Sequence, residues 1–284
     1  MRVLITGSTG SAGKVVAQHF YQAGIPIRLA VRSVAKAQAS WGNTSAEIHA
    51  FDFSRAETFR NALSEISHLW LIAPPGSQDI EPVKKLLEET PHQLEHIIML
   101  SGRTTGDVEG LLLQRTEQYL AKQTTPYTVL RAGWFMQNFT SWMKSDIEEG
   151  VLGLPTAEAR TAFVDLRDLA LAAERVILDS KHRGKHYEIV GPEALSHAEI
   201  TAILSRELGR LIEYQALSQE AYIQQQIQAG WSPAAAQWTA YLYELVRTGK
   251  EAALSTDFEY ITGHPGRSFA TFVNDYKQTW GAPH

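Results

Sequence analysis

A short apolar run at the start of the chain leads directly into three evenly spaced glycines. Residues 3–6 read Val-Leu-Ile-Thr, and Gly7, Gly10 and Gly13 follow while a helix-like segment begins near Ser11. In a strand, turn and helix of this kind, Gly7 allows a tight turn, Gly10 lets the backbone approach a ligand, and Gly13 lets the helix pack closely on the sheet. The start of the helix then offers unpaired N–H groups and roughly half a positive charge to a phosphate. We therefore expect a pyrophosphate cradle here.

The glycine pattern alone is a weak signal, because the chain contains 20 glycines among 284 residues. Its setting is more specific. Ala12, Val16, Phe20 and Ala23 recur at helical spacing beside the glycines, and strand, turn and helix is the context that a dinucleotide-binding turn requires. An ordinary glycine-rich turn is the alternative interpretation.

Short β-like runs alternate with helical stretches over the first 131 residues, which is typical of a parallel sheet covered by helices. Right-handed crossovers leave few topologies for such a sheet, and we expect the strand order 3-2-1-4-5-6 with the ligand above strands 1 and 4. The loop Pro74-Pro75-Gly76 follows the fourth strand at that edge. The expected strands are residues 3–6, 27–31, 48–51, 69–72, 97–101 and 128–131.

After Arg131 the alternation becomes less regular. We expect helices over residues 166–179, 197–208, 218–229 and 233–249, and short strands over 186–190 and 211–215. The predicted fold class is therefore α/β, a Rossmann-type doubly wound parallel sheet with a smaller, mostly helical C-terminal substrate lobe. We place the nucleotide-binding domain at residues 1–150 and the lobe, interleaved with the sheet edge and without a clean linker, at residues 151–284.

The composition excludes several classes of protein. A net charge of −5 leaves no basic stripe for nucleic acid or for an anionic membrane. The chain has no cysteine, and its ten histidines show no metal-ligand spacing, so we expect neither disulfides nor a metal site. No apolar run is long enough to span a membrane, and the first strand begins at residue 2, which leaves no length for a signal peptide. We therefore expect a cytoplasmic protein.

The end of the second expected strand indicates which dinucleotide binds. NAD-selective sites usually have an acidic residue there, about 20 residues past the glycines, to bind the ribose 2′-OH. This chain has Arg32 at that place, and Lys36 follows one helical turn later. A guanidinium and an ammonium group favour a 2′-phosphate, so we expect NADP(H) to be preferred over NAD(H). A solvated cation at the strand end is the alternative for Arg32.

The ends of the third and fourth expected strands supply further candidates. Asp52 and Phe53 follow the third strand, where a carboxylate can bind the adenine amino group and an aromatic ring can cover the base. The alternative for Asp52 is a turn-forming aspartate. The fourth strand ends in Ala73, Pro74 and Pro75, which we expect to line the inner ribose unless they form a plain loop.

These features, together with residues 126–138 (Pro-Tyr-Thr-Val-Leu-Arg-Ala-Gly-Trp-Phe-Met-Gln-Asn), resemble the NmrA-like group of atypical short-chain dehydrogenases/reductases. The likeness extends through residues 163–170 and 191–196 to the Ser268-Phe269 region, so it covers nearly the whole chain. Within the group, the Trp-Phe-Met-x-Asn stretch and the terminal helix ending at Trp280 are most similar to clavine (ergot-alkaloid) dehydrogenases. Triphenylmethane reductase and an NADPH-quinone reductase are similar as well.

The resemblance implies an NADP(H)-binding Rossmann domain and a small-molecule substrate that is aromatic or conjugated. Phe135 and Asn138 would border this substrate. Trp231 is a further candidate because it belongs to a set of aromatics that could cover a flat substrate, with core packing as the alternative for Trp134, Phe135 and Trp231. The implied cofactor-binding residues are Gly7, Ser8, Thr9, Gly10, Ser11, Ala12 and Gly13 at the pyrophosphate, Arg32 and Lys36 at the 2′-phosphate, and Gly133 and Trp134 near the nicotinamide.

One feature of the wider superfamily is missing. Most short-chain dehydrogenases use a Tyr-x-x-x-Lys pair on the helix after strand 5 and a serine at the end of that strand. Here Ser101 ends strand 5 and is a candidate catalytic residue, but Glu109 and Leu113 align with the tyrosine and lysine. None of the ten tyrosines has a lysine four residues later.

Loss of a general acid usually costs about 10²- to 10⁴-fold in rate, so a simple ketone is a poor acceptor for this chain. We therefore expect hydride transfer to a cationic or electron-poor conjugated acceptor, such as an iminium, a triarylmethyl cation or a quinone. The alternative function is a non-catalytic NADP(H) sensor that regulates a protein partner, as the resemblance to the NmrA-like group also allows.

Overall fold

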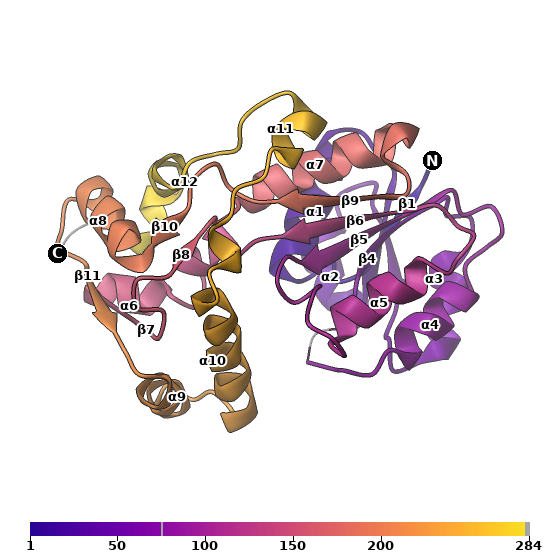
Figure 1. Cartoon of the computed structure of the whole chain (residues 1–284). Helices are drawn as coiled ribbons and strands as arrows, with labels where there is room; N and C mark the ends of the chain where they lie inside the picture. The colour runs from indigo at the N-terminus through magenta and orange to yellow at the C-terminus, as the bar shows by residue number, and fades with distance from the viewer. Residues whose placement is uncertain (75, 282–284) are drawn as a thin grey trace. The chain divides into compact units, whose positions relative to one another are not determined.

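The computed structural model describes residues 1–74 and 76–281 and consists of two compact units (Figure 1). The first unit contains residues 1–132, 166–189 and 257–264, and the second unit contains residues 133–165, 190–256 and 265–284. The chain therefore passes from one unit to the other after residues 132, 165, 189, 256 and 264.

A seven-stranded sheet forms the centre of the first unit, with the strand order β3-β2-β1-β4-β5-β6-β9. Figure 1 labels five of its strands, β1, β4, β5, β6 and β9. Every neighbouring pair in this sheet is parallel, which confirms the expected fold class and the order 3-2-1-4-5-6. The additional strand β9 pairs with β6 and corresponds to the strand expected over residues 186–190. The strands are β1 (Val3–Ile5), β2 (Ile27–Val31), β3 (Glu47–Ala50), β4 (His68–Ile72), β5 (His96–Gly102), β6 (Tyr127–Ala132) and β9 (Lys185–Ile189).

The central strands are mostly apolar and buried because helices cover both faces of the sheet. All three residues of β1 are fully buried, and Leu69, Leu71 and Met99 join them in the core. Helix α1 packs beside α7, although the two lie far apart in the sequence. The helices of this unit are α1 (Ser11–Gln22), α2 (Val34–Trp41), α3 (Phe59–Leu63), α4 (Glu81–Glu88), α5 (Leu112–Leu120), α7 (Leu166–Leu178) and α11 (Asp257–Thr262), with the 3₁₀ turns η1 (Ala56–Thr58) and η3 (Ser180–His182).

The second unit is mostly helical and has two small two-stranded sheets, one that pairs β7 with β11 and one that pairs β8 with β10. Its core is rich in aromatic rings, and Phe139 lies 5.0 Å from Phe269 and 5.2 Å from Phe163 between ring centroids. The elements are η2 (Met136–Thr140), α6 (Lys144–Glu149), β7 (Val151–Leu154), β8 (Arg160–Thr161), β10 (Leu195–Ser196), α8 (His197–Leu208), β11 (Glu213–Ala216), α9 (Gln219–Gln228), α10 (Pro233–Arg247), η4 (Lys250–Ala252), α12 (Phe269–Tyr276) and η5 (Lys277–Trp280).

Serine side chains mark where the helices of this unit begin. Ser196 forms a capping box with Glu199 at the start of α8, while Ser218 and Ser232 accept backbone N–H groups at the starts of α9 and α10. Because a serine cap satisfies a donor that the helix itself leaves unpaired, these positions fix the helix starts in the sequence. Across residues 1–74 and 76–281, no helix combines the length and the apolar character needed to cross a bilayer.

Candidate cofactor site

The turn after β1 has the geometry that its glycines predict. Gly7 adopts a φ of +64°, in the left-handed region where an L side chain is strained, and its carbonyl accepts a hydrogen bond from the Gly10 N–H at 2.9 Å. Gly10 caps α1 without any side-chain hydrogen bond to the helix. The first N–H groups of a helix lack intrahelical partners, so the start of α1 presents donors and a partial positive charge beside the turn.

Gly13 is where α1 approaches the turn most closely. A Cβ at this position would overlap the Gly7 carbonyl oxygen and would lie 2.7 Å from the Gly7 carbonyl carbon and 3.1 Å from the Ser8 Cα. These are backbone atoms, which cannot rotate away as a side chain would. The third glycine therefore maintains the short distance between helix and turn, as the motif predicts.

Ser8 and Thr9 have different roles in the turn. The Ser8 side chain is buried, and its hydroxyl donates to the Ala30 carbonyl at 3.0 Å, which ties the turn to β2. Thr9 is exposed, as is Ser11 at the start of α1, whereas Ala12 is buried. A phosphate at this turn would thus meet backbone N–H groups and the Thr9 hydroxyl, with Ser8 holding the turn in place.

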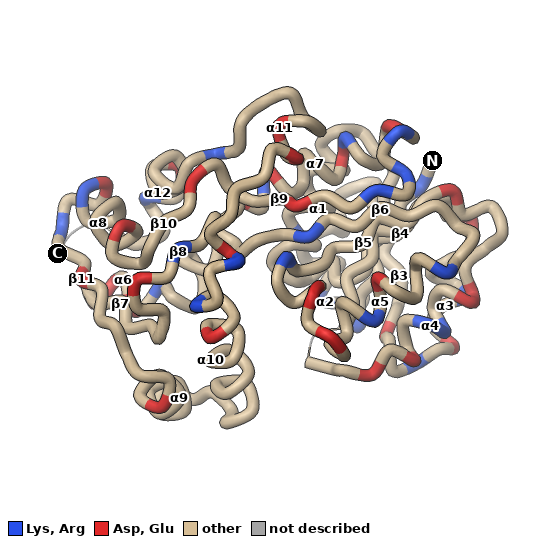
Figure 2. Tube along the Cα trace, viewed as in Figure 1, with Lys and Arg blue, Asp and Glu red and all other residues tan. Residues whose placement is uncertain are grey.

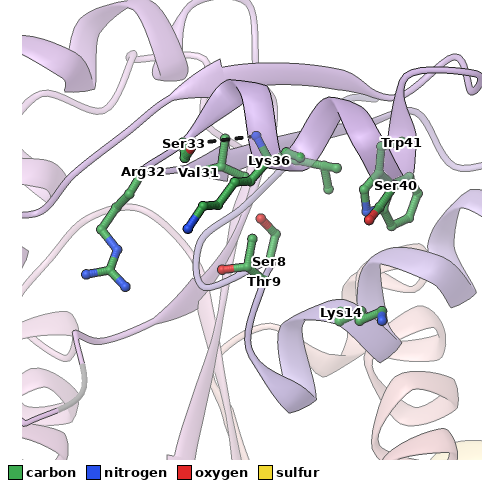
Figure 3. A pocket seen from close by; sticks show the side chains of 11 residues that line it. Ser8, Thr9, Lys14, Val31, Arg32, Ser33, Lys36, Ser40 and Trp41 are labelled. Atoms are coloured by element: carbon green, nitrogen blue, oxygen red, sulfur yellow. Dashed lines mark hydrogen bonds between the residues drawn. The ribbon is translucent and has the colours of Figure 1, made fainter.

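A cavity of about 500 Å³ lies beside this turn (Figure 3). Arg32 and Lys36 both line it (Figure 3). Ser33 caps α2 by accepting the Lys36 backbone N–H, so the helix begins directly after Arg32. The cavity is lined by Ser8, Thr9, Lys14, Leu29, Val31, Arg32, Ser33, Lys36, Ala37, Ser40 and Trp41.

The charge of this lining is entirely positive. Lys14, Arg32 and Lys36 line the cavity, and the lining has no aspartate or glutamate. The sequence reasoning missed Lys14. Its only signal is a cation directly after Gly13, and the glycine spacing does not indicate where that side chain reaches.

The ends of β3 and β4 hold the other nucleotide candidates. Asp52 is partly buried, and its Oδ1 accepts the Ser54 N–H at 2.9 Å and the Ser54 hydroxyl at 2.8 Å. These bonds from Ser54 hold the pKa of Asp52 below its usual value, with a weaker contribution from Arg32. Asp52 therefore forms a turn through one carboxylate oxygen. Phe53 lies edge-on to Phe51 with 5.0 Å between ring centroids.

Two residues of the predicted ribose loop are described. Ala73 is buried and Pro74 is half-buried directly after β4, whereas Pro75 lies outside the described residues.

Ser101 belongs to a buried ionic network. Its hydroxyl donates to Glu117 Oε1 at 2.5 Å, and both side chains are almost fully buried. Glu117 also accepts from Arg131 Nη2 at 2.6 Å, and Arg131 Nη1 reaches Asp107 at 2.7 Å. The hydrogen bond to Glu117 raises the pKa of Arg131. Because the Ser101 proton points to Glu117, only the lone pairs of the Ser101 hydroxyl are left for a ligand.

The segment that aligns with the usual Tyr-Lys pair differs from the expected helix. Helix α5 begins at Leu112, so Glu109 precedes the helix and Leu113 lies in its first turn. Gly110, just before the helix, adopts a φ of +82°. Glu109 is exposed and Leu113 is partly buried.

The remaining candidates belong to the second unit. Gly133 has no room for a side chain, since a Cβ there would lie 2.8 Å from the Ala162 carbonyl oxygen. Trp134 is partly exposed and stacks on Tyr243 with 4.9 Å between ring centroids. Phe135 pairs with Val164 in a single β-bridge.

Asn138 and Trp231 are also partly exposed. Asn138 lies in η2, where its backbone carbonyl accepts the Met143 N–H at 3.2 Å, and Trp231 lies edge-on to Trp142 with 5.8 Å between ring centroids. Trp134 and Trp231 thus each pack against a neighbouring aromatic ring and keep part of their own surface exposed.

A parallel sheet with a glycine turn after its first strand and a cationic cavity after its second defines an NAD(P)-binding protein of the Rossmann type. Residues 7–148 match an NAD(P)H-binding family, and residues 114–255 match the NmrA-like family. The chain belongs to the NmrA-like family, which confirms the resemblance seen in the sequence.

Named relatives agree with this assignment. An uncharacterized oxidoreductase of Bacillus subtilis is 30% identical, with 98% of this chain and 96% of the relative covered. Agroclavine dehydrogenase of Claviceps fusiformis is 27% identical, with 99% of both chains covered. The expected class, an NAD(P)H-dependent oxidoreductase, is therefore confirmed.

Solved structures show the same fold. The NADPH complex of an NADPH-dependent quinone oxidoreductase from Escherichia coli superposes with a TM-score of 0.86 at 25% identity, covering 98% of this chain and 100% of the other. Triphenylmethane reductase from Citrobacter sp., complexed with NADP(H), superposes with a TM-score of 0.84 at 24% identity, covering 95% and 98%.

Proposed function

We propose that this chain is an NADP(H)-dependent reductase that transfers hydride to a small conjugated or cationic acceptor, without a Tyr-Lys proton donor. The observation that carries the preference for NADP(H) is the cavity at the end of β2. Arg32 and Lys36 line it beside the glycine turn, and its lining has no carboxylate that could bind a ribose 2′-OH.

The residues present fit such a cofactor. The close approach at Gly13 and the start of α1, where Gly10 provides no side-chain hydrogen bond, form a cradle for a pyrophosphate, and Arg32 supplies a planar fork of donors to a phosphate. When bound, NADPH would supply the hydride from its nicotinamide ring. The task of the chain is then to hold and orient the two reactants.

The proton chemistry restricts the acceptor. Ser101 donates to Glu117, and residues 109 and 113 provide no tyrosine or lysine, so no side chain of the usual set is available to protonate a carbonyl oxygen. Without such an acid the reduction of a simple ketone would slow by about 10²- to 10⁴-fold. Acceptors that already carry positive charge, or that are conjugated and electron-poor, need no proton in the hydride step.

We assign the acceptor contacts to Phe135, Asn138 and Trp231 of the second unit, which are all partly exposed. Flat aromatic surfaces such as that of Trp231 favour planar conjugated ligands. The names of the similar proteins support this substrate class, since a quinone oxidoreductase and agroclavine dehydrogenase are among them.

The test is a panel of acceptors with either NADPH or NADH as the reductant. Quinones, iminium compounds and triarylmethane dyes should oxidise NADPH, measured by its near-ultraviolet absorbance, while simple ketones should not. Arg32→Ala should raise the KM for NADPH about tenfold or more and leave the KM for NADH nearly unchanged, because only NADPH carries the 2′-phosphate.

Two outcomes would count against the proposal. An equal rise in the KM for NADPH and for NADH in the Arg32→Ala variant would contradict the contact between Arg32 and the 2′-phosphate. Binding of NADPH without oxidation by any acceptor would instead favour the non-catalytic sensor.

A further inference from the structure

We propose that Lys14, on the first turn of α1, is a third cation of the 2′-phosphate site and a determinant of the preference for NADP(H). This inference rests on the proposed function, because it assigns a residue to the same cofactor. It concerns a side chain that neither the glycine motif nor the end of β2 identifies.

The first observation is geometric. Lys14 comes from α1, Arg32 follows β2, and Lys36 lies on α2, yet all three side chains line one cavity (Figure 3). Lys14 and Lys36 are both exposed, so an anion can reach them from solvent. Ser33, Ser40 and Trp41 complete this part of the lining. Three separate elements therefore bring positive charge to the lining of one cavity, with Arg32 and Lys14 on opposite sides and Lys36 between them (Figure 3).

The second observation is the position of the lysines in their helices. Lys14 and Lys36 both lie in a first turn, where the helix already carries partial positive charge, and neither helix has an acidic residue in that turn. In contrast, Glu81, Glu199 and Glu220 occupy the first turns of α4, α8 and α9. Cations at these two helix starts repel the helix dipoles and one another unless an anion lies between them.

The third observation is that the cavity lining contains no carboxylate to neutralise its three cations. Basic and acidic residues are intermixed along the chain (Figure 2), and many of the cations form ion pairs with carboxylates. Examples are the ion pairs Arg28–Glu47, Arg131–Glu117 and Lys144–Glu148. In the part of the chain that the structure describes, no hydrogen bond or ion pair joins Lys14, Arg32 or Lys36 to a carboxylate, and the carboxylate that interacts with Arg32 electrostatically is Asp52, outside the cavity lining. A dianion from outside the chain would supply the missing charge.

The lining also indicates which phosphate Lys14 meets. Besides Ser8 and Thr9, the cavity is bounded by the end of β2 and by α2, which is the side of the fold where the adenosine ribose presents its 2′ position. The pyrophosphate is expected at the start of α1 itself. Lys14 is therefore assigned to the 2′-phosphate, and we expect it to act as a point charge beside the bidentate Arg32.

The experiment uses adenosine 2′,5′-bisphosphate and adenosine 5′-monophosphate, which differ only in the 2′-phosphate. Calorimetric titrations of the full chain should show that Lys14→Gln lowers the affinity for the bisphosphate about tenfold and changes the affinity for the monophosphate less than twofold. Lys14→Arg, which retains the charge, should stay within about threefold of the parent for both ligands. Lys85→Gln removes an exposed lysine of α4 as a matched control and should change neither affinity.

The outcomes separate this inference from the proposed function. Equal weakening of both ligands by Lys14→Gln, or no weakening of either, would overturn the assignment of Lys14 while leaving NADP(H) binding intact. If the parent chain bound the bisphosphate no more tightly than the monophosphate, the preference for NADP(H) itself would be refuted. Circular dichroism of each variant establishes that a loss of affinity is not a loss of fold.

Discussion

Replacing Gly13 with alanine tests the packing of α1 against the glycine turn. In an ordinary helix interior this change would stabilise the protein by roughly 1 kcal/mol, because alanine has the higher helix propensity. At Gly13 the added Cβ overlaps the Gly7 carbonyl oxygen and lies 2.7 Å from the Gly7 carbonyl carbon. A separation below 3.0 Å from backbone atoms requires the helix or the turn to move.

The cost of this movement outweighs the gain in propensity. Forcing an extra methyl group into a close-packed site costs about 1–3 kcal/mol, and more where the neighbours are backbone. We therefore expect Gly13→Ala to lower the free energy of unfolding, measured by urea denaturation, by about 1–2 kcal/mol. The variant should also bind NADPH less tightly, because the turn opens.

Gly10→Ala is the matched control. A Cβ at Gly10 would meet only the Gly7 carbonyl oxygen at 3.4 Å, an ordinary contact, so the free energy of unfolding should change by less than about 1 kcal/mol. Its NADPH affinity should nevertheless fall, because the new methyl group lies where a phosphate approaches the backbone. A Gly13→Ala variant as stable as the parent would refute the account of this turn.

Two further predictions concern buried charge. Glu117→Gln should lower the free energy of unfolding by about 2–4 kcal/mol in urea denaturation, since Arg131 loses a buried partner, whereas the exposed Glu109→Gln should have no effect. Burial lowers the pKa of His197 to about 4. Between about pH 6.5 and pH 4 the unfolded chain therefore binds a proton at this histidine that the folded chain does not bind. The free energy of unfolding should fall as the pH falls through this range, by up to about 1.4 kcal/mol per pH unit. His197→Gln should flatten the dependence of unfolding free energy on pH between 7 and 5, and an unchanged slope would contradict this pKa.

The central strands were predictable because an uninterrupted apolar run indicates a strand that is buried on both faces of a sheet. Residues 97–100 form a continuous apolar run, and all of them are buried in β5. The place of β9 was harder to predict. Lys185 and His186 are exposed, while Tyr187 and Ile189 are buried. This pattern is typical of any short half-buried strand and does not indicate which strand is its partner. Its pairing with β6 is a long-range contact that local pattern does not contain.

The lining of the candidate cofactor cavity was predictable only in part. Arg32 and Lys36 were identified because a strand end and a helical turn place them by spacing alone. Lys14 was missed because the direction of its side chain depends on how α1 and α2 lie beside each other. The bond from Ser101 to Glu117 joins residues that are 16 apart in the sequence, and only the packing of α5 on β5 reveals it.

Calorimetric titration of the unmodified chain with NADPH and with NADH tests the central claim most directly. The cationic cavity beside the glycine turn predicts a saturable heat of binding for NADPH and an affinity for NADH that is at least about tenfold weaker. Absence of any heat with NADPH, or tighter binding of NADH, would contradict the account.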